Sequence, residues 1–305
     1  MPAPIIEISH LAKHYGSFHA VRDLNLTVEQ GDVYGFLGPN GAGKSTTIRM
    51  MMSLIRPTSG DIRIFGQSLN EHRSEILRRV GAIVERPDFY NYLSARRNLE
   101  LLGRLSGADV SKANVNRVLG IVGLGERAES KVKTFSHGMK QRLGLAQALI
   151  HNPDLIVLDE PSTGLDPQGM VDMRDLILEL AHDHKKTVFL SSHILPEVEL
   201  TANRMVIINR GKTIIEGSVQ ELLNAGRLKV TIETTDVPRA LEVLRATPDG
   251  EWIQSSTDQE IIIMLNRQDI PSVVASLATA DIPLRAVTPV RSLEEYFISL
   301  TRETA

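Results

Sequence analysis

The chain has 305 residues, of which 42% are hydrophobic and 23% charged, enough for one large globular domain and a small one. Its 34 basic and 37 acidic residues give a net charge of −3, so no overall basic field recruits nucleic acid. The absence of cysteine excludes disulfides, and no apolar run approaches the about 20 residues that a membrane-spanning helix needs. The first residues lack the basic and apolar blocks of a secretory signal, so we expect a cytoplasmic protein.

Residues 5–37 alternate apolar and polar side chains and predict β-structure. Tyr15 lies in this region, where its ring could stack on an adenine base. The alternative is a tyrosine buried in a strand. Further along, turn and periodicity signals predict a strand at 61–65, a helix at 71–79 and a strand at 80–84 that ends at Glu85.

A glycine loop follows the predicted strand 33–37 and precedes a predicted helix, 46–52. Its residues match the pattern G-x-x-x-x-G-K-[ST] and are Gly38, Pro39, Asn40, Gly41, Ala42, Gly43, Lys44, Ser45 and Thr46. In this context backbone N–H groups and a helix N-terminus point at one spot, where a di- or triphosphate fits. Lys44 adds a positive charge for the phosphates, and Ser45 offers its hydroxyl to Mg²⁺.

Leucine and valine residues at helical spacing predict a helical insertion that begins near residue 94. An amphipathic helix follows it, opened by Ser136, which is a natural N-cap, and by Gly138. Small residues at a helix N-terminus form a second possible anion site. The alternative is an ordinary capped helix.

Two later strands end in polar residues. The apolar run 155–158 predicts a strand buried on both faces, and it ends in Asp159 and Glu160. A carboxylate at this point, in a chain with a phosphate loop, is placed to hold Mg²⁺, and the neighbouring Glu160 could orient or deprotonate water. The predicted strand 187–190 leads to His193, and residues 205–215 predict a hairpin.

From about residue 226 the pattern changes. Strand-like and helical stretches follow in the order β-α-β-β-α-β and end with a predicted helix at 293–300. This order predicts a small α+β domain of ferredoxin-like type. We therefore expect two domains, 1–225 and 226–305.

Taken in order, the phosphate loop, the Ser-x-Gly helix start, the strand-end Asp-Glu pair and the strand-end histidine resemble the nucleotide-binding subunit of an ABC transporter. The resemblance covers residues 4 to about 220. It implies an α/β P-loop NTPase core of ABC type, with an antiparallel β-subdomain and a helical insertion at about 94–150. It also implies that the glycine loop is the Walker A loop and that residues 162–166 form the D-loop. The resemblance further assigns roles to single residues: Asp159 is the Walker B carboxylate, Glu160 the catalytic glutamate, His193 the switch histidine and Tyr15 the adenine-stacking aromatic.

Two positions depart from the family pattern. The signature, usually Leu-Ser-Gly-Gly-Gln, is Phe-Ser-His-Gly-Met at residues 135–139, so His137 and Met139 replace the third and fifth residues. Glu85 stands where the family usually has a glutamine that senses Mg²⁺, and a carboxylate can still ligate the ion. The pattern around Glu85 resembles the branch that includes bacitracin- and lantibiotic-export ATPases.

The resemblance implies a mechanism and partners. Two chains would face each other around a twofold axis, with ATP held between Gly38–Thr46 of one chain and Ser136 and Gly138 of the other. Lys44, Glu160 and His193 would carry out hydrolysis, with Mg²⁺ held by Ser45, Asp159 and Glu85. The subunit would lie on the inner face of the cell membrane and drive a separate permease, as an exporter. The alternative is a soluble ABC-type mechanoenzyme acting on ribosomes or DNA; the charge balance gives no reason to expect nucleic acid as a partner.

Overall fold

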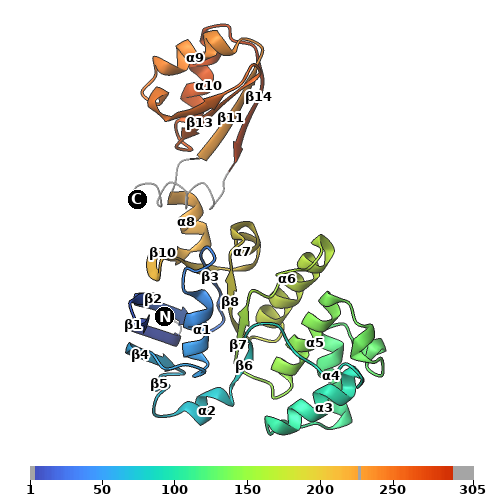
Figure 1. Ribbon diagram of the computed structural model, residues 1–305. Coiled ribbons are helices and arrows are strands. Elements are labelled where there is room, and N and C mark those ends of the chain that lie inside the picture. Colours follow the sequence, from blue (N-terminus) through green and yellow to red (C-terminus); the bar gives the residue numbers. More distant parts are fainter. Residues whose placement is uncertain (1–3, 226–227, 291–305) are drawn as a thin grey trace. The chain divides into compact units, whose positions relative to one another are not determined.

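The computed structural model describes residues 4–225 and 228–290, which form two compact units divided after Ser218 (Figure 1). The division comes at the start of α8 (Val219–Ala225), a few residues before the boundary expected from the sequence. Each unit has its own hydrophobic core. None of the helices within the described residues is long and apolar enough to cross a membrane.

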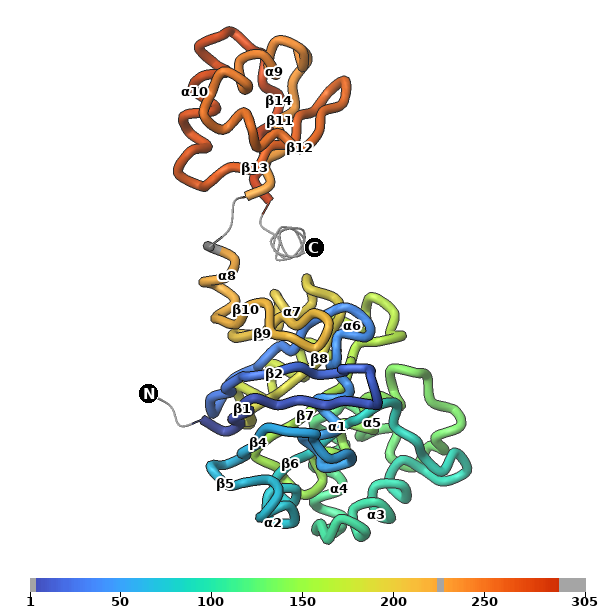
Figure 2. Tube along the Cα trace, turned by 60° about the vertical axis from the view of Figure 1, so that its left-hand side comes forward, coloured from blue at the N-terminus to red at the C-terminus, as the bar shows by residue number. Residues whose placement is uncertain are grey.

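The first unit contains the predicted antiparallel β-subdomain. Its four strands pair in the order β2-β1-β4-β5, and Figure 2 shows β1 and β2 side by side along their length. The second half of β2 alternates buried and exposed side chains as the sequence predicts, whereas register shifts between β1 and β2 interrupt the alternation in β1. Their bounds are Pro4–Tyr15 for β1, Phe18–Glu29 for β2, Ser59–Ile64 for β4 and Gln67–Ser68 for β5.

A six-stranded sheet forms the centre of this unit, in the order β10-β9-β3-β8-β7-β6. Only the pair β9 and β10 is antiparallel, and this pair is the predicted hairpin. All residues of β3 and β7 are buried, as their unbroken apolar sequences predict. The strands are β3 (Val33–Leu37), β6 (Val80–Ile83), β7 (Leu155–Asp159), β8 (Thr187–Ser192), β9 (Arg204–Asn209) and β10 (Lys212–Ser218).

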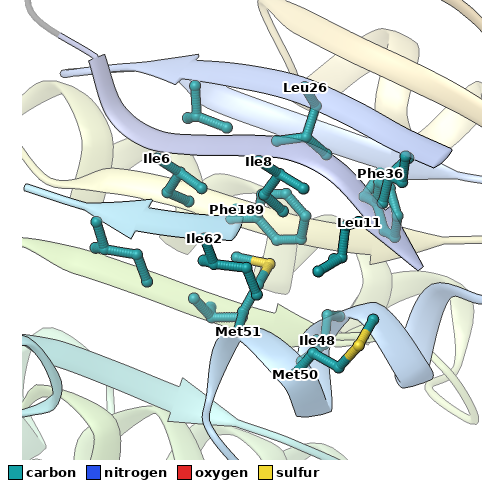
Figure 3. Packing of buried hydrophobic residues seen from close by; sticks show 14 of the residues in the cluster. Ile6, Ile8, Leu11, Leu26, Phe36, Ile48, Met50, Met51, Ile62 and Phe189 are labelled. Carbon is teal, nitrogen blue, oxygen red and sulfur yellow. The ribbon is translucent and has the colours of Figure 1, made fainter. Parts of the chain in front are cut away.

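Helix α1 (Lys44–Met51) packs between the two sheets. Figure 3 shows Ile48 and Met51 of this helix near Ile6 and Ile8 of β1 and Phe189 of β8, all of them buried. This core holds the start of α1 directly beyond the end of β3. Two further helices in this unit are α2 (Arg73–Leu77) and α7 (Leu195–Thr201).

The predicted helical insertion is present as α3 (Ala95–Leu105), α4 (Lys112–Ile121) and α5 (His137–Leu149), which lie together in Figure 1. Serine side chains cap all three helices, at Ser94, Ser111 and Ser136. Short 3-10 turns at Gly125–Arg127 and Val132–Thr134 connect α4 to α5. Helix α6 (Pro167–His182) follows β7 and is capped by Asp166.

The second unit has the element order predicted for it, up to residue 290. Its four strands form one antiparallel sheet in the order β12-β13-β11-β14, and two helices pack on that sheet through Leu244 and Leu277. The predicted helix at 293–300 lies outside the described residues. The elements are β11 (Leu228–Thr234), α9 (Val237–Arg245), the 3-10 turn Gly250–Trp252, β12 (Ile253–Ser256), β13 (Glu260–Leu265), α10 (Ile270–Thr279) and β14 (Leu284–Val290).

Candidate functional site

The central sheet brings the separated sequence motifs to one edge. Strands β3, β8, β7 and β6 are neighbours in this order and run parallel, so their carboxyl ends meet. The glycine loop follows β3, His193 follows β8 and Glu160 follows β7. Glu85 lies just beyond β6. Residues that are more than a hundred positions apart in the chain therefore surround one site.

Close backbone contacts fix the shape of the glycine loop. Gly43 has a left-handed φ of 108°, and a Cβ on it would lie 2.6 Å from the carbonyl oxygen of Ala20 in β2. A Cβ on Gly38 would lie 2.4 Å from the carbonyl oxygen of Ile208 in β9. Only glycine fits at these two positions. The loop is therefore a rigid backbone cradle of the kind that accepts phosphate oxygens.

The start of α1 is suited to an anion. Gly43 is its N-cap, so no side chain accepts a hydrogen bond from the first N–H groups, and the first turn has no acidic residue. These N–H groups and the helix dipole together favour a negatively charged ligand. The glycine cradle and the helix start thus fit a phosphate group.

Lys44 and Glu160 are brought into contact by this arrangement. The Lys44 side chain is 5% exposed, and its Nζ donates to the carbonyl oxygen of Gly38 at 2.7 Å. The same Nζ lies 3.2 Å from Oε1 of Glu160. A charged amine at the centre of the cradle has the position needed to neutralise phosphate charge.

Glu160 is the centre of a small polar network. Its Oε2 accepts hydrogen bonds from Thr163 Oγ1 and from His193 Nδ1, both at 2.9 Å. Burial alone would raise the pKa of Glu160, but the Thr163 hydroxyl, Lys44 and His193 together hold the pKa below its usual value. Glu160 is therefore ionised at neutral pH. Its backbone has a φ of 50°, which is uncommon outside glycine and frequent at functional sites.

Asp159 is buried beside Glu160 and is held by a residue that the sequence analysis does not single out. Ser191 of β8 donates from Oγ to Asp159 Oδ1 at 2.6 Å, and the same Oγ accepts from the Glu160 backbone N–H at 2.9 Å. Ser191 therefore fixes both acidic residues. The available signal for Ser191 was a polar residue near the end of an apolar strand, two residues before His193. Thr163 offered a similar signal, because it lies four residues after Asp159 and three after Glu160.

The three predicted metal ligands line one cavity of about 220 Å³. These are the Ser45 hydroxyl and the carboxylates of Asp159 and Glu85, with Glu160 also in the lining. Glu85 is ion-paired with Arg49 of α1. Within the described residues no cluster of three or more histidine, cysteine or acidic side chains could hold a metal unaided. This donor set fits Mg²⁺, which commonly takes one or two protein carboxylates together with water and phosphate oxygens.

Tyr15 lies at the end of β1 with 48% of its surface exposed. The alternative of a tyrosine buried in a strand is therefore wrong. The Nζ of Lys13 lies 5.1 Å from the centroid of its ring. An open aromatic face, beside the strand that contacts the glycine loop, is compatible with stacking on a base.

The predicted second anion site lies at the start of α5. Ser136 caps this helix, and its Oγ accepts from the backbone N–H of Met139 at 3.2 Å. Ser136 and Gly138 do not line the cavity that holds Ser45 and Asp159, whereas the intervening His137 does. The nitrogen Nε2 of His137 lies 3.2 Å from the carbonyl oxygen of Thr163.

Comparison with known proteins agrees with this geometry. The family model described as ABC transporter matches residues 21–163. The bacitracin transport ATP-binding protein BcrA of Bacillus licheniformis is 47% identical over 240 residues, covering 79% of this chain and 78% of that protein. The daunorubicin/doxorubicin resistance ATP-binding protein DrrA of Streptomyces peucetius is 34% identical over 314 residues, covering 100% of this chain and 94% of that protein.

A solved dimeric ATP-binding cassette bound to ADP and Pi covers 70% of this chain and 98% of its own, with a TM-score of 0.61 and 23% identity. This likeness shows the shared fold. The match to BcrA confirms the resemblance to the bacitracin branch that the sequence motifs predicted. The chain belongs to the ABC transporter family, in which it is an ATP-binding subunit with ATPase activity.

Proposed function

We propose that this subunit hydrolyses ATP between two copies of the chain and thereby drives export by a separate permease. The contact of Lys44 and His193 with one carboxylate, that of Glu160, is the observation that carries the proposal. These contacts connect the end of the phosphate loop, where α1 begins, to the ends of the parallel strands β7 and β8. A γ-phosphate and an attacking water would meet at this point.

Each residue of the site has a role in this reaction. The Gly38–Thr46 loop binds the phosphates through its N–H groups, and Lys44 neutralises their charge. Glu160, ionised because its pKa is lowered, orients water and accepts its proton. His193 holds Glu160 and contacts the γ-phosphate. Tyr15 stacks on the adenine ring.

Ser45, Asp159 and Glu85 would hold Mg²⁺. The bound ion would neutralise charge on the phosphate oxygens. Ser191 keeps Asp159 oriented toward the cavity through its 2.6 Å hydrogen bond. The Arg49–Glu85 ion pair competes with this role of Glu85, because one carboxylate group serves both cations.

A homodimer completes the ATP site. Ser136 and Gly138 lie outside the cavity lined by Ser45 and Asp159, which supports a second chain as the source of these two residues for the nucleotide. The dimeric cassette that shares this fold supports such an assembly. The Ser136 end of α5 would then meet the γ-phosphate bound by the other chain, and hydrolysis would release the clamp.

The direction and location of transport rest on the relatives. BcrA is named for bacitracin transport and DrrA for daunorubicin and doxorubicin resistance, and removal of a toxic compound from the cell fits both names. We infer that this chain lies on the cytoplasmic face of the membrane beside an export permease. These relatives, together with the net charge of −3, disfavour a mechanoenzyme on ribosomes or DNA.

The second unit is proposed to be a ferredoxin-like accessory domain that follows an ATP-binding domain of residues 1–225. Its β-α-β-β-α-β order and its antiparallel sheet order β12-β13-β11-β14 support this assignment. The alignment with DrrA spans both units and supports the proposal that such a domain accompanies the ATP-binding domain.

A pull-down tests the proposed partner. Tagged full-length chain carrying Glu160→Gln is loaded with Mg-ATP and recovered from detergent-solubilised cells. We expect co-elution of a polytopic membrane protein, and a parallel sample that also carries Lys44→Ala serves as the control without bound nucleotide. Recovery of ribosomes or nucleic acid without a membrane protein would overturn the transporter assignment.

Hydrolysis by the purified chain tests the proposed base. Glu160→Gln is expected to lower turnover by about 100-fold or more while ATP binding is kept. The matched control is Glu179→Gln, because Glu179 lies on α6 and is paired with His184. Turnover by Glu160→Gln at the unaltered rate would remove Glu160 from the mechanism.

A further inference from the structure

The start of α5 is connected to the loop that follows β7. Nε2 of His137 lies 3.2 Å from the carbonyl oxygen of Thr163. A carbonyl oxygen can only accept, so the N–H of His137 Nε2 is the donor. His137 is the first residue of α5, between Ser136 and Gly138.

Thr163 extends this connection to the proposed base. Its Oγ1 donates to Glu160 Oε2 at 2.9 Å, and its backbone N–H donates to the Glu160 carbonyl oxygen at 3.1 Å. Thr163 is therefore linked to both the carboxylate and the backbone of Glu160. A displacement of the Thr163 carbonyl would change the direction of the carboxylate that faces Lys44 and His193.

The neighbouring glycine makes room for the histidine ring. Gly164 has a left-handed φ of 78°, and a Cβ on it would lie 3.2 Å from His137 Nε2. The left-handed turn and the missing side chain bring the Thr163 carbonyl within reach of the ring. The ABC signature usually has glycine in place of His137, and glycine has no side chain that could make this contact. The connection therefore depends on the side chain of His137.

We propose that His137 is a positioning residue that couples the two ATP sites of the dimer. The inference rests on the proposed function, in which Ser136 and Gly138 contact the nucleotide of the other chain. A shift of the α5 start on binding that nucleotide would pass through His137 and Thr163 to Glu160, which acts on this chain's own nucleotide. Nucleotide binding at each site would then change the position of the catalytic base, Glu160, at the other site.

The exposure of the His137–Thr163 hydrogen bond decides which measurement can detect its effect. His137 and Thr163 are both exposed, so the hydrogen bond between them contributes little to folding stability. Its effect should therefore appear in turnover and leave the melting temperature and ATP binding unchanged. A purely structural histidine would show the opposite pattern.

The test compares variants of the full-length chain in steady-state hydrolysis of Mg-ATP. His137→Gly is expected to lower kcat by about fivefold, with KM for ATP unchanged. His137→Gln, which keeps an N–H donor, should recover at least half of the loss. His184→Gly, at an exposed histidine beyond α6, is the matched control and should have the unaltered kcat.

A double variant tests the route through the threonine hydroxyl. Thr163→Val removes the hydroxyl that holds Glu160 and leaves the backbone carbonyl in place. If His137 acts through Thr163, the combination His137→Gly with Thr163→Val should be no slower than Thr163→Val alone. Multiplied effects of the two substitutions, or an unaltered kcat in His137→Gly, would overturn the proposal.

A binding measurement separates positioning from assembly. In the Glu160→Gln background, ATP-driven dimerisation followed by size-exclusion chromatography should be unaffected by His137→Gly. Loss of the dimer would mean that His137 serves assembly, and the proposal would be wrong. Failure of the proposed function would give a different result. The Glu160→Gln chain with His137 intact would then hydrolyse ATP at the normal rate or would not dimerise when ATP is added.

Discussion

At the scale of single residues, charge compensation explains the arrangement of the site. Three acidic side chains lie close together, and each has its own partner: Lys44 for Glu160, Ser191 for Asp159 and Arg49 for Glu85. Each partner gives its carboxylate a favourable contact that offsets part of the repulsion between neighbouring like charges. Oxygen atoms of this kind are the ligands that Mg²⁺ prefers.

The Arg49–Glu85 pair leads to a prediction about Mg²⁺. Glu85→Gln removes a proposed ligand and should raise the Mg²⁺ concentration for half-maximal hydrolysis by about threefold to tenfold. Arg49→Gln frees the carboxylate and should lower that concentration. The Glu85 side chain is 61% exposed and that of Arg49 40%, so stability should change by less than about 1 kcal/mol. The measurement is a Mg²⁺ titration at fixed ATP; identical curves for both variants and the parent chain would exclude Glu85 as a ligand.

Glu197 leads to a prediction about pH. Burial raises the pKa of Glu197 above the ordinary 4.5, despite a hydrogen bond from Ser162, and its Oε1 is buried without a hydrogen-bond partner among the described residues. Ionisation therefore destabilises the folded state at neutral pH, and this loss disappears as the pH falls through the raised pKa. Glu197→Gln should raise the melting temperature at neutral pH by about 2 °C, with no gain below pH 4.5. A gain that persists in acid would contradict the assignment.

At the scale of elements, two glycines let α5 lie directly on its neighbours. A Cβ on Gly81 of β6 would lie 2.2 Å from the carbonyl oxygen of Ala148 in α5. A Cβ on Gly144 of α5 would lie 2.9 Å from Pro87. The helix that starts at the signature is therefore held against the strand that leads to Glu85. The position of Ser136 depends on this packing.

The glycine contact predicts a large loss of stability for a small substitution. Gly81→Ala must push α5 away from β6 and should lower the free energy of unfolding by about 2 kcal/mol or more. Gly120→Ala in α4 is the matched control. It has nothing within 4 Å of the added Cβ, and it should stabilise the chain by about 0.5 kcal/mol. Denaturant unfolding measures both; equal effects of the two substitutions would show that α5 can move freely.

At the scale of the whole molecule, each of the two units has a core of its own within the described residues. The first is built around α1 and the two sheets of residues 4–218, and the second around β11, β13 and two helices. Only the first core supports the phosphate loop and the strand-end acids. Nucleotide binding should therefore depend on the first unit, and the second unit should keep its own fold.

Calorimetry of the full chain should accordingly show two unfolding transitions. Mg-ATP at about 100 times its Kd should stabilise the first unit by about 2.7 kcal/mol and leave the second transition in place. Lys44→Ala should remove the shift, because its amine lies at the centre of the phosphate cradle. A single transition whose midpoint temperature rises as a whole when ATP is added would show that the two units unfold cooperatively.

The sequence predicted most elements of the fold because their signals are local. Alternation identified β1 and β2, and unbroken apolar runs identified β7 and β8. Helix α6 was not among these predictions, although its Asp166 cap and Pro167 are recognisable signals. Ser191 and Arg49 were not identified as site residues, and Thr163 was included only as part of the D-loop 162–166. Each of the three acts through a partner that only folding brings near.

The sequence by itself determined the family, the phosphate loop and the catalytic candidates, because these depend on residue types at fixed spacings along a strand, a loop and a helix start. Only the tertiary structure decided how they meet. The parallel order β3-β8-β7-β6 places Lys44, His193 and Glu160 at one edge, and the packing of α5 brings His137 to Thr163. Such contacts join residues far apart in the chain, and no local pattern encodes the distance between them.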